Sequence, residues 1–331
     1  MKTLSRRLLQ LGLFGAIGSS ILLAEKATEP TVFIGMCDAS AAAALDGERF
    51  VVADDEDNVL RVYSRKGGEA LFEFDLSEFL GNAGKKKPKE ADLEAAAQIG
   101  MHTFWITSHG RNARGQDKPE RQRLFATSVR TKGDHVQISP VGMPYSSLLD
   151  ALESDPRLAG YNLKEAAGLA PKAPGGLNIE GLAATPEGHL LIGFRSPLRE
   201  GKALLVPLLN PLEVVQGAPA KLGAPTELDL QGLGIRSIER CGKRYIVIAG
   251  STGESQEPSR VFEWDGKSQP RLIKDVTLSG LNPEGVAFHA NEGDGEYFVL
   301  SDDGTRAVEG QDCKDLKDPT LKRFRGRVLT F

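Results

Sequence analysis

The sequence is poor in aromatic residues and in cysteine, and it lacks several well-known catalytic motifs. Phe, Trp and Tyr together make up 6% of the 331 residues, and there are only three cysteines. Three cysteines allow at most one disulfide within a monomer. The chain contains no Gly-x-Ser-x-Gly elbow, no glycine-rich phosphate loop and no His-Glu-x-x-His motif. It therefore carries no signature of a serine hydrolase elbow, a nucleotide-binding P-loop or a zinc protease helix.

Positive charge is not in excess either. There are 41 Lys and Arg against 45 Asp and Glu, which gives a net charge of −4. This balance gives no support to nucleic-acid binding. With 40% hydrophobic and 26% charged residues, the composition is typical of a globular protein that can bury a large core. Glycine is abundant, with 37 residues, and suits a fold with many turns.

The first 24 residues differ from the rest of the chain. Lys2, Arg6 and Arg7 supply a basic start, and Leu8–Ala24 carry no charge. This layout predicts a signal peptide over residues 1–24 and export to the periplasm, by the general secretory or the twin-arginine route. The alternative is an uncleaved anchor, although the uncharged run is short for a membrane span. We expect the mature protein not to span a membrane.

Five stretches of the remaining chain share one pattern. Each has a short apolar strand, a tight turn, a second apolar strand that ends in polar residues, and a third strand. The aligned third positions of the first strands are spaced by 55, 86, 56 and 48 residues and are Ala39, Glu94, Glu180, Arg236 and Glu284. Repeats of about 40 to 50 residues with three or four strands are typical of propeller blades. The sequence predicts an all-β, five-bladed β-propeller in a single domain, residues 30–331.

A fourth, outer strand is expected after four of the repeats, for example at Glu69–Leu76 and His135–Val141. It is missing after the fifth, whose third strand is expected at Arg327–Phe331. Thr31–Gly35 can supply it, which would close the ring and remove exposed sheet edges. The alternatives are an open sandwich with chance repetition and a propeller with a sixth, degenerate blade.

Long connections gather on one face of the predicted propeller, where the first strands begin and the second strands end. They are residues 110–122, 143–176 and 304–322. The segment 143–176 is expected to be a lid-like insertion, with helical stretches at Tyr145–Leu152 and Leu163–Leu169. Long ordered loops in a compact domain are usually functional. The pattern predicts a recessed site with a lid at this face.

Charged residues are predicted to converge on the same face, around the mouth of the central channel. The first and second strands bring there Glu94, Glu180, Glu284, Arg236, Asp54, Asp55, His109, Arg195, Asp302 and Asp303. Converging carboxylates repel one another unless a cation or an arginine lies between them. Oxygen-rich clusters suit a hard cation such as Ca²⁺, and the candidate ligands are Glu94, Glu180, Glu284, Asp54 and Asp302. Neutralisation by Arg195 and Arg236, or simple turn capping, remains the alternative.

These residues lead to two function hypotheses. The first is a cation-dependent hydrolase of an ester or phosphoester, in which the cation lowers the pKa of a bound water. Its candidate catalytic residues are Glu180 or Glu284 as base, Arg195 or Arg236 as anion holder, and His109 at the mouth. The second is a non-catalytic ligand-binding or scaffold propeller of the cell envelope. In both cases we expect a monomer that binds a small molecule or an envelope ligand and no nucleic acid.

Three fragments resemble a bacterial family catalogued as domain of unknown function 3616, and the resemblance covers nearly all of the mature chain. They are Ala53–Asn58, Asn178–Ala183 and Phe324–Gly326. That family has no assigned activity. The Asn-x-Glu-Gly strand starts are also similar to those of the esterase-like phytase propellers, and this more distant resemblance implies a metal-assisted hydrolase. Ala39 and Arg236 depart from the glutamate pattern, which argues against a symmetric metal ring.

The position of each cysteine predicts one disulfide. Cys37 directly precedes the first inner strand, and Cys313 lies in the long connection of the fifth blade, so both belong to the long-loop face. The two blades are neighbours once the ring closes, whereas Cys241 lies in a short turn of the opposite face. We therefore predict a Cys37–Cys313 disulfide with Cys241 free, against the alternative of three reduced cysteines. A chain-entropy model gives about 4 to 5 kcal/mol for so long a loop.

Overall fold

The structure is a computed structural model. It describes residues 29–84, 87–133, 135–253, 255, 257–274, 276, 278–290 and 295–329. The predicted signal peptide at residues 1–24, with its export route and its alternative as an anchor, lies outside the described residues. Within them, no helix combines the length and the apolar character that a membrane crossing requires.

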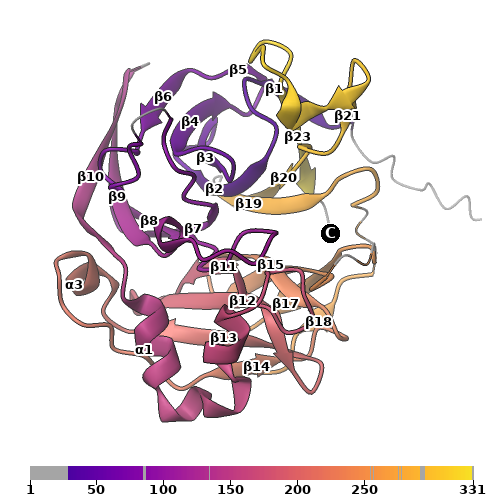
Figure 1. Cartoon of the computed structure of the whole chain (residues 1–331). Helices are drawn as coiled ribbons and strands as arrows, with labels where there is room; N and C mark the ends of the chain where they lie inside the picture. The colour runs from indigo at the N-terminus through magenta and orange to yellow at the C-terminus, as the bar shows by residue number, and fades with distance from the viewer. Residues whose placement is uncertain are drawn as a thin grey trace, which may run out of the picture.

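Four antiparallel sheets of four strands each form the first four blades (Figure 1). In each sheet the strands follow one another outward in chain order, as the repeats predict. From the inside outward, blade one is β2 (Ala39–Ala44), β3 (Arg49–Asp54), β4 (Val59–Ser64) and β6 (Phe72–Asp75), and blade two is β7 (Leu93–Ile99), β8 (His102–Thr107), β9 (Leu124–Lys132) and β10 (His135–Tyr145). Blade three is β11 (Asn178–Ala184), β12 (Leu190–Arg199), β13 (Lys202–Leu208) and β14 (Thr226–Leu228), and blade four is β15 (Gly234–Cys241), β16 (Arg244–Gly250), β17 (Arg260–Trp264) and β18 (Arg271–Leu272).

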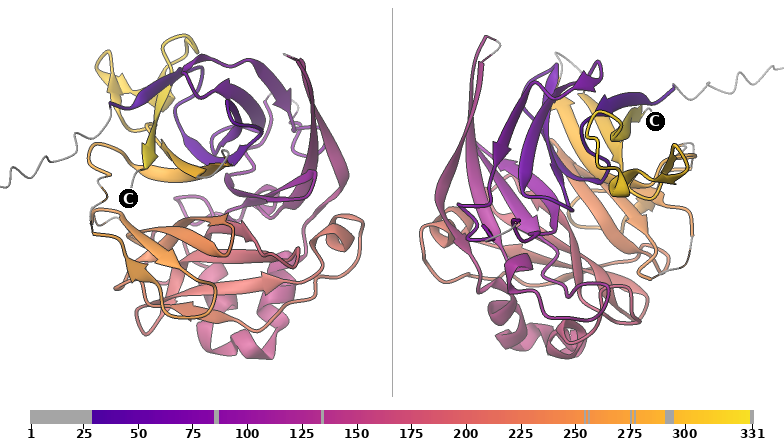
Figure 2. Two further views of the ribbon diagram at one scale, coloured as in Figure 1. Left: turned by 180° about the vertical axis from the view of Figure 1, so that it is seen from behind. Right: turned by 45° about the horizontal axis from the view of Figure 1, so that its top comes forward.

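Blade five combines both ends of the chain. Its order is β19 (Pro283–Ala290), β20 (Gly295–Ser301), β23 (Arg323–Leu329), β1 (Thr31–Ile34) and β5 (Gly68–Glu69). The N-terminal strand β1 pairs antiparallel with β23, and the indigo and yellow segments lie together in Figures 1 and 2. The predicted closure of the ring by an N-terminal strand is therefore confirmed.

The five innermost strands form a closed ring, because β2, β7, β11 and β15 each contact the next and β19 contacts β2. The predicted five-bladed propeller is confirmed, and neither an open sandwich nor a sixth blade is present in the described chain. Small residues suit the crowded inner strands. In blade three, a Cβ on Gly181 would lie 2.7 Å from a methyl carbon of Ile235 in blade four, so only glycine permits this close approach.

A hydrophobic cluster fills each of the five interfaces between neighbouring blades. The seam between blades five and one has an aromatic core, whose rings come from both ends of the chain: Phe33, Phe50, Tyr63, Phe298 and Phe324. The rings of Phe33 and Phe324 stack with their centroids 4.7 Å apart. Closure of the ring therefore rests on buried aromatic area as well as on strand pairing.

Strand β10 runs to Tyr145 instead of Val141, and two further strand boundaries differ from the prediction at the seam. The third strand of blade five is β23, which begins at Arg323 instead of Arg327, because Phe324 is fully buried in the aromatic core. The outer strand of blade one is shorter than Glu69–Leu76, since Glu69 belongs to β5 and pairs in parallel with β1. In both cases the contact that decides the boundary lies across the seam, between the two ends of the chain.

The insertion between blades two and three is helical in part. It contains α1 (Leu148–Ser154), η2 (Pro156–Tyr161) and α2 (Leu163–Ala167), close to the two predicted helical stretches. Its apolar side chains join the core between blades two and three. In Figure 1, helix α1 lies next to the strands of blade three. The segment thus packs into the space between two blades. Its role as a lid stays a prediction. The short elements elsewhere are α3 (Pro211–Val215), η1 (Pro119–Arg121), η3 (Cys313–Asp315), β21 (Ala307–Val308) and β22 (Gln311–Asp312).

The predicted disulfide is confirmed. Cys37 and Cys313 are bonded with a Cα–Cα distance of 5.9 Å, although 276 residues separate them in sequence. Both are fully buried, together with Leu316, and Cys241 is free. The bond fastens the long connection of blade five to the start of blade one, and it is consistent with an exported protein.

Candidate functional site

A β-bulge interrupts the innermost strand of every blade at its channel-mouth end. The strand pairing shifts register in all five blades, and the extra residues are Ser40, Glu94, Glu180, Arg236 and Glu284. None of these residues is more than 9% exposed. Bulges re-aim a side chain and are common beside functional sites. The three glutamates and Arg236 thus occupy equivalent positions, as the alignment expects.

In blade one the equivalent residue is Ser40, so the expected Ala39 is wrong by one position. The shift arises because Asp38 already pairs with Asp302 across the seam, and the bulge follows one residue later. The Ser40 hydroxyl donates to the backbone carbonyls of Leu93 and Ala53. Ser40 therefore ties blade one to blade two and presents no charge to the channel.

Blades three to five carry a chain of charge pairs, which we call the arginine half of the mouth: Glu180, Arg195, Arg236 and Glu284. Arg195 Nη1 donates to Glu180 Oε1 at 2.7 Å, and Arg236 Nη2 pairs with Glu284 Oε1. Arg236 Nε lies 3.6 Å from Glu180 Oε2, so one arginine bridges two glutamates. Buried charges persist only when they are paired. Neutralisation by arginine therefore accounts for Glu180 and Glu284.

Backbone and amide groups hold the arginine half in place. Arg195 Nε donates to the Ser251 carbonyl at 2.6 Å, and Arg236 Nη1 donates to Asn282 Oδ1 at 3.0 Å. Burial alone would lower the pKa of Arg195, but the Glu180 carboxylate outweighs this effect and the pKa rises. Two buried acceptors, Glu180 Oε2 and Asn178 Oδ1, accept no hydrogen bond in the described chain. Unpaired buried acceptors are costly, so this half can still receive a hydrogen-bond donor.

Blade one supplies the opposite kind of surface, which we call the acidic centre: Asp38, Asp54 and Asp55. One ligand oxygen from each lies within 4.8 Å of the other two. Asp38 directly precedes β2, Asp54 ends β3, and Asp55 begins the turn that follows. The Asp55 amide donates to the Asp38 carbonyl, which holds the two residues side by side. Among the described residues, no ion pair links a basic side chain to any of the three carboxylates.

Burial and mutual repulsion make the ionised form of the acidic centre unfavourable. Burial, followed by the carboxylates of Asp54 and Asp302, raises the pKa of Asp38 to about 8. Burial and the nearby Asp57 raise the pKa of Asp54 to about 7. For Asp55, burial and then the Glu94 carboxylate raise the pKa well above its ordinary value. Burial disfavours the charged form and like charges add to it, so this cluster favours a proton or a bound cation.

Glu94 extends the acidic region from blade two. It is 9% exposed, and its carboxylate makes no hydrogen bond or ion pair within the described residues. Burial, then Asp92 and Glu180, raise its pKa well above the ordinary value. Asp92 differs, since Arg121 Nη1 donates to its carboxylate at 2.9 Å. Among the three glutamates of the bulges, Glu94 is thus the one that lacks an arginine partner.

The two aspartates that directly follow β20 are held by local contacts. Asp302 accepts from Asn282 Nδ2 at 2.8 Å and from the Gly304 amide at 2.8 Å. Asp303 accepts two hydrogen bonds from Arg325, both at 2.6 Å. Asp302 lies next to the acidic centre through its bridge to Asp38, whereas Asp303 belongs to the support of β23.

The hydrogen bonds of His109 stay within its own strand end. Its Nδ1 is 2.8 Å from the Thr107 carbonyl, and the charged group that affects it is Arg123. Burial is the main reason that its pKa falls to about 4, so the ring is neutral at pH 7. Its φ of +55° is a left-handed conformation that fixes the ring at the end of β8. Among the described residues, no hydrogen bond joins His109 to another predicted site residue.

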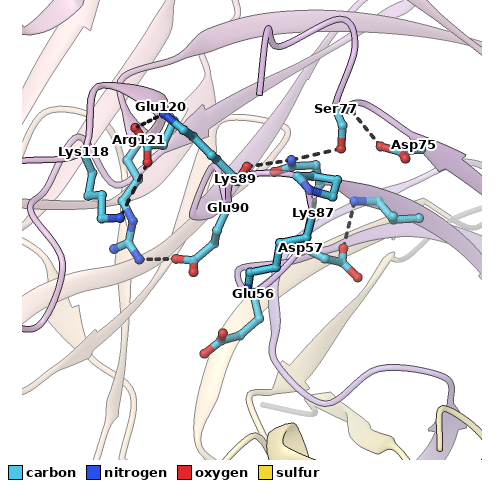
Figure 3. Close-up of a pocket in the computed structure, with 13 residues that line it drawn as sticks. Glu56, Asp57, Asp75, Ser77, Lys87, Lys89, Glu90, Lys118, Glu120 and Arg121 are labelled. Atoms are coloured by element: carbon cyan, nitrogen blue, oxygen red, sulfur yellow. Dashed lines mark hydrogen bonds and ion pairs between the residues drawn. The ribbon is translucent and has the colours of Figure 1, made fainter. Parts of the chain in front are cut away.

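A pocket of about 460 Å³ opens between blades one and two (Figure 3). It begins at Glu56, which follows the acidic centre in sequence, and extends to the connection that carries Lys87 and Lys89. Two of its carboxylates have partners, because Glu90 pairs with Arg121 and Glu120 lies 3.6 Å from the Lys118 ammonium. Its floor includes Ser77, whose oxygen accepts from Asn58 Nδ2 at 3.1 Å. The pocket is a polar space beside the mouth, large enough for a small molecule.

Asp38 is the site residue that the sequence reasoning missed. The alignment placed Cys37–Ala41 at the start of a strand but singled out only the third position, where the other blades have a charge. One feature of the sequence could have identified Asp38. It directly follows Cys37, which the predicted disulfide brings to the channel mouth. Lys314, directly after Cys313, was missed in the same way, and its ammonium lies 3.5 Å from Glu56 Oε1.

Comparison with solved structures finds β-propeller proteins at low sequence identity. The glutaminyl cyclase of Myxococcus xanthus is 12% identical, with 92% of this chain and 97% of that one covered and a TM-score of 0.45. A GH43_1 enzyme from Xanthomonas citri is 12% identical, with 90% and 88% covered and a TM-score of 0.45. The PQQ-bound aldose sugar dehydrogenase of Streptomyces coelicolor is 14% identical, with 91% and 99% covered and a TM-score of 0.42. No curated protein matches the sequence.

The family comparison is more specific. A model of the family described as "Protein of unknown function (DUF3616)" matches residues 142–284. The matched segment runs from the end of β10 to the bulge of blade five, and it includes the arginine half and the fragment Asn178–Ala183. It covers less of the chain than the resemblance implies. The match confirms that resemblance over residues 142–284.

Proposed function

We propose that the protein is a cation-dependent hydrolase that acts on an ester or phosphoester at the channel mouth. The observation that supports this proposal is the division of the mouth into two halves. At blades one and two, the carboxylates of the acidic centre and of Glu94 have no basic partner among the described residues, whereas blades three to five present paired arginines. The acidic half of the mouth, formed by the acidic centre and Glu94, can hold a cation. The arginine half can orient an anionic substrate.

The chemistry follows from this division. The cation would polarise the ester oxygen and lower the pKa of a bound water. The water oxygen would attack the carbonyl carbon or phosphorus, a carboxylate would take the water proton, and the alcohol would leave with a proton. A bound cation would keep Glu94 ionised, and Glu94 then suits the base role better than Glu180 or Glu284, because these two are neutralised by Arg195 and Arg236.

The remaining residues would orient the substrate. Arg195 uses Nε and Nη1 in its contacts with Ser251 and Glu180, which leaves Nη2 for an anionic group. The polar pocket between blades one and two offers space for the rest of the molecule (Figure 3). His109 is buried and its Nδ1 contacts the Thr107 carbonyl of its own strand, so we assign it a structural role.

A panel of chromogenic carboxyl and phosphate esters tests the proposal. We expect turnover of at least one ester in the presence of Ca²⁺, loss of turnover with a chelator, and recovery when Ca²⁺ is restored. Glu94→Gln should lower kcat by about 100-fold or more, as expected for a lost general base. The absence of turnover on every ester would contradict the proposal and favour a non-catalytic binding or scaffold propeller of the envelope.

We propose further that the protein works in the periplasm, after removal of residues 1–24. The support is the signal-peptide layout together with the disulfide, since disulfides persist in oxidising compartments. Fractionation of cells that express the full chain should recover the processed protein in the periplasmic fraction. Recovery of the unprocessed chain in the cytoplasm, with reduced cysteines, would contradict this location.

A further inference from the structure

The acidic centre meets the distance requirement of a single ion. Its three carboxylate oxygens, from Asp38, Asp54 and Asp55, all lie within 4.8 Å of one another. Oxygens bound to one Ca²⁺ lie about 2.3–2.6 Å from it, so any two of them are at most about 5 Å apart. The backbone therefore already brings these carboxylates to within reach of one cation.

Two neighbouring groups without partners point to a ligand at this place. Asp55 Oδ1 is inaccessible to solvent and accepts no hydrogen bond in the described chain. Glu94 comes from a different blade, is 9% exposed, and also has no hydrogen-bond or ion-pair partner among the residues described. Ser40, two residues after Asp38, donates its hydroxyl to the carbonyl of Leu93, and this contact brings Glu94 beside the acidic centre. Buried charges are normally paired or bound to a metal.

The donor set selects a hard cation. All three ligands are carboxylates, and Cys37, which precedes Asp38, is bonded to Cys313 and offers no thiolate. The group of possible ligand atoms found among the described residues contains no histidine. Three carboxylates suit Ca²⁺ better than Mg²⁺, which keeps most of its waters and usually takes one or two carboxylates.

We propose that one Ca²⁺ binds Asp38, Asp54 and Asp55 at the seam between blades five and one, with Glu94 facing it from blade two. This inference rests on the proposed function for the choice of working face, and it places the cation away from Glu180 and Glu284. The remaining coordination positions are open to water and to a substrate oxygen.

Lys314 supplies a second way to test the location. Its Nζ lies 3.5 Å from Glu56 Oε1, and its positive charge acts on the Asp38 carboxylate. The disulfide fixes this arrangement, because Asp38 follows Cys37 and Lys314 follows Cys313. An ammonium beside the centre repels an incoming cation, so its removal should strengthen binding.

Calorimetric titration of the mature chain with CaCl₂ measures these effects directly. We expect one site per chain in the wild-type protein. Asp38→Asn and Asp55→Asn should each weaken the affinity by more than about tenfold, since each removes a ligand. Lys314→Gln should strengthen it by about threefold. Asp229→Asn, an exposed carboxylate of the blade three connection, is the matched control and should change nothing.

Circular dichroism and disulfide mapping of each variant confirm that it folds. The proposed site would be contradicted if the protein binds no Ca²⁺. It would also be contradicted if the folded variants Asp38→Asn and Asp55→Asn keep the wild-type affinity for Ca²⁺. It would also be overturned if binding depends on Glu180, tested with Glu180→Gln, and this result would leave the proposed function intact. Binding with the expected variant pattern but without turnover of any ester would support the site and contradict the hydrolase.

Discussion

At the scale of single residues, Arg236 carries most of the charge balance of the arginine half, because it contacts glutamates from blades three and five. Arg236→Leu would leave Glu284 buried without a partner, and breaking such a pair typically costs about 3–5 kcal/mol. Chemical denaturation should show a loss of this size. The double variant Arg236→Leu with Glu284→Leu should recover a large part of it, and a double variant less stable than the single one would contradict the pairing.

His109 predicts a pH dependence of stability. Burial lowers its folded-state pKa from 6.5 to about 4, so the unfolded chain binds the proton more readily. Its stabilising contribution is present above pH 6.5 and is lost as the pH falls towards 4. The difference corresponds to about 3 kcal/mol over this window.

Comparison with His109→Asn isolates this contribution, because asparagine tolerates the left-handed φ of +55°. Denaturation curves between pH 7 and pH 4 should show that the wild type loses its advantage over the variant as the pH falls. An unchanged difference in unfolding free energy across this range would contradict a buried, neutral His109.

At the scale of secondary-structure elements, strand β1 closes the ring, and Phe33 is its buried anchor. Phe33 is fully buried against four other rings, so Phe33→Ala should cost about 3–5 kcal/mol and should loosen β1 from β23. Val32→Ala is the control, since Val32 is 42% exposed on the same strand. Hydrogen exchange of β23 should accelerate in the Phe33 variant and not in the control. Equal exchange in both would show that β1 does not close the ring.

The sequence predicted the elements where local pattern decides them, and it failed where a distant contact does. Five repeats of apolar strands and turns were enough to predict blades, and the order of the strands in each blade agrees with the structure. The start of β23 was misplaced because Phe324 is buried by residues from the other end of the chain. Ser40 was missed because a bulge moves the equivalent position by one residue.

The candidate site shows the same limit. The positions of Glu94, Glu180 and Glu284 followed from the repeat, but which of them meets an arginine did not. Arg236 of blade four contacts one glutamate in each neighbouring blade. The periodicity of the repeats does not predict which glutamates an arginine will contact. Asp38 was missed because it lies one residue before strand β2 and pairs with Asp302 across the seam.

At the scale of the whole molecule, the Cys37–Cys313 disulfide joins the first and last blades across 276 residues. A loop of this length gives a stabilisation of about 5 kcal/mol in the chain-entropy model. The double variant Cys37→Ala with Cys313→Ala should therefore unfold at clearly lower denaturant concentration. Cys241→Ala, which removes the free cysteine, should change stability by less than about 1 kcal/mol. A stable double variant would show that the seam is held by its aromatic core alone.

The central claim is that the acidic half of the mouth holds a cation, and anomalous diffraction from crystals grown with MnCl₂ tests it most directly. Mn²⁺ prefers the same oxygen ligands and marks its position without reference to any activity. The account predicts a peak within about 2.5 Å of carboxylate oxygens of Asp38, Asp54 and Asp55. A peak between Glu180 and Glu284 instead, or no peak at the mouth, would contradict it.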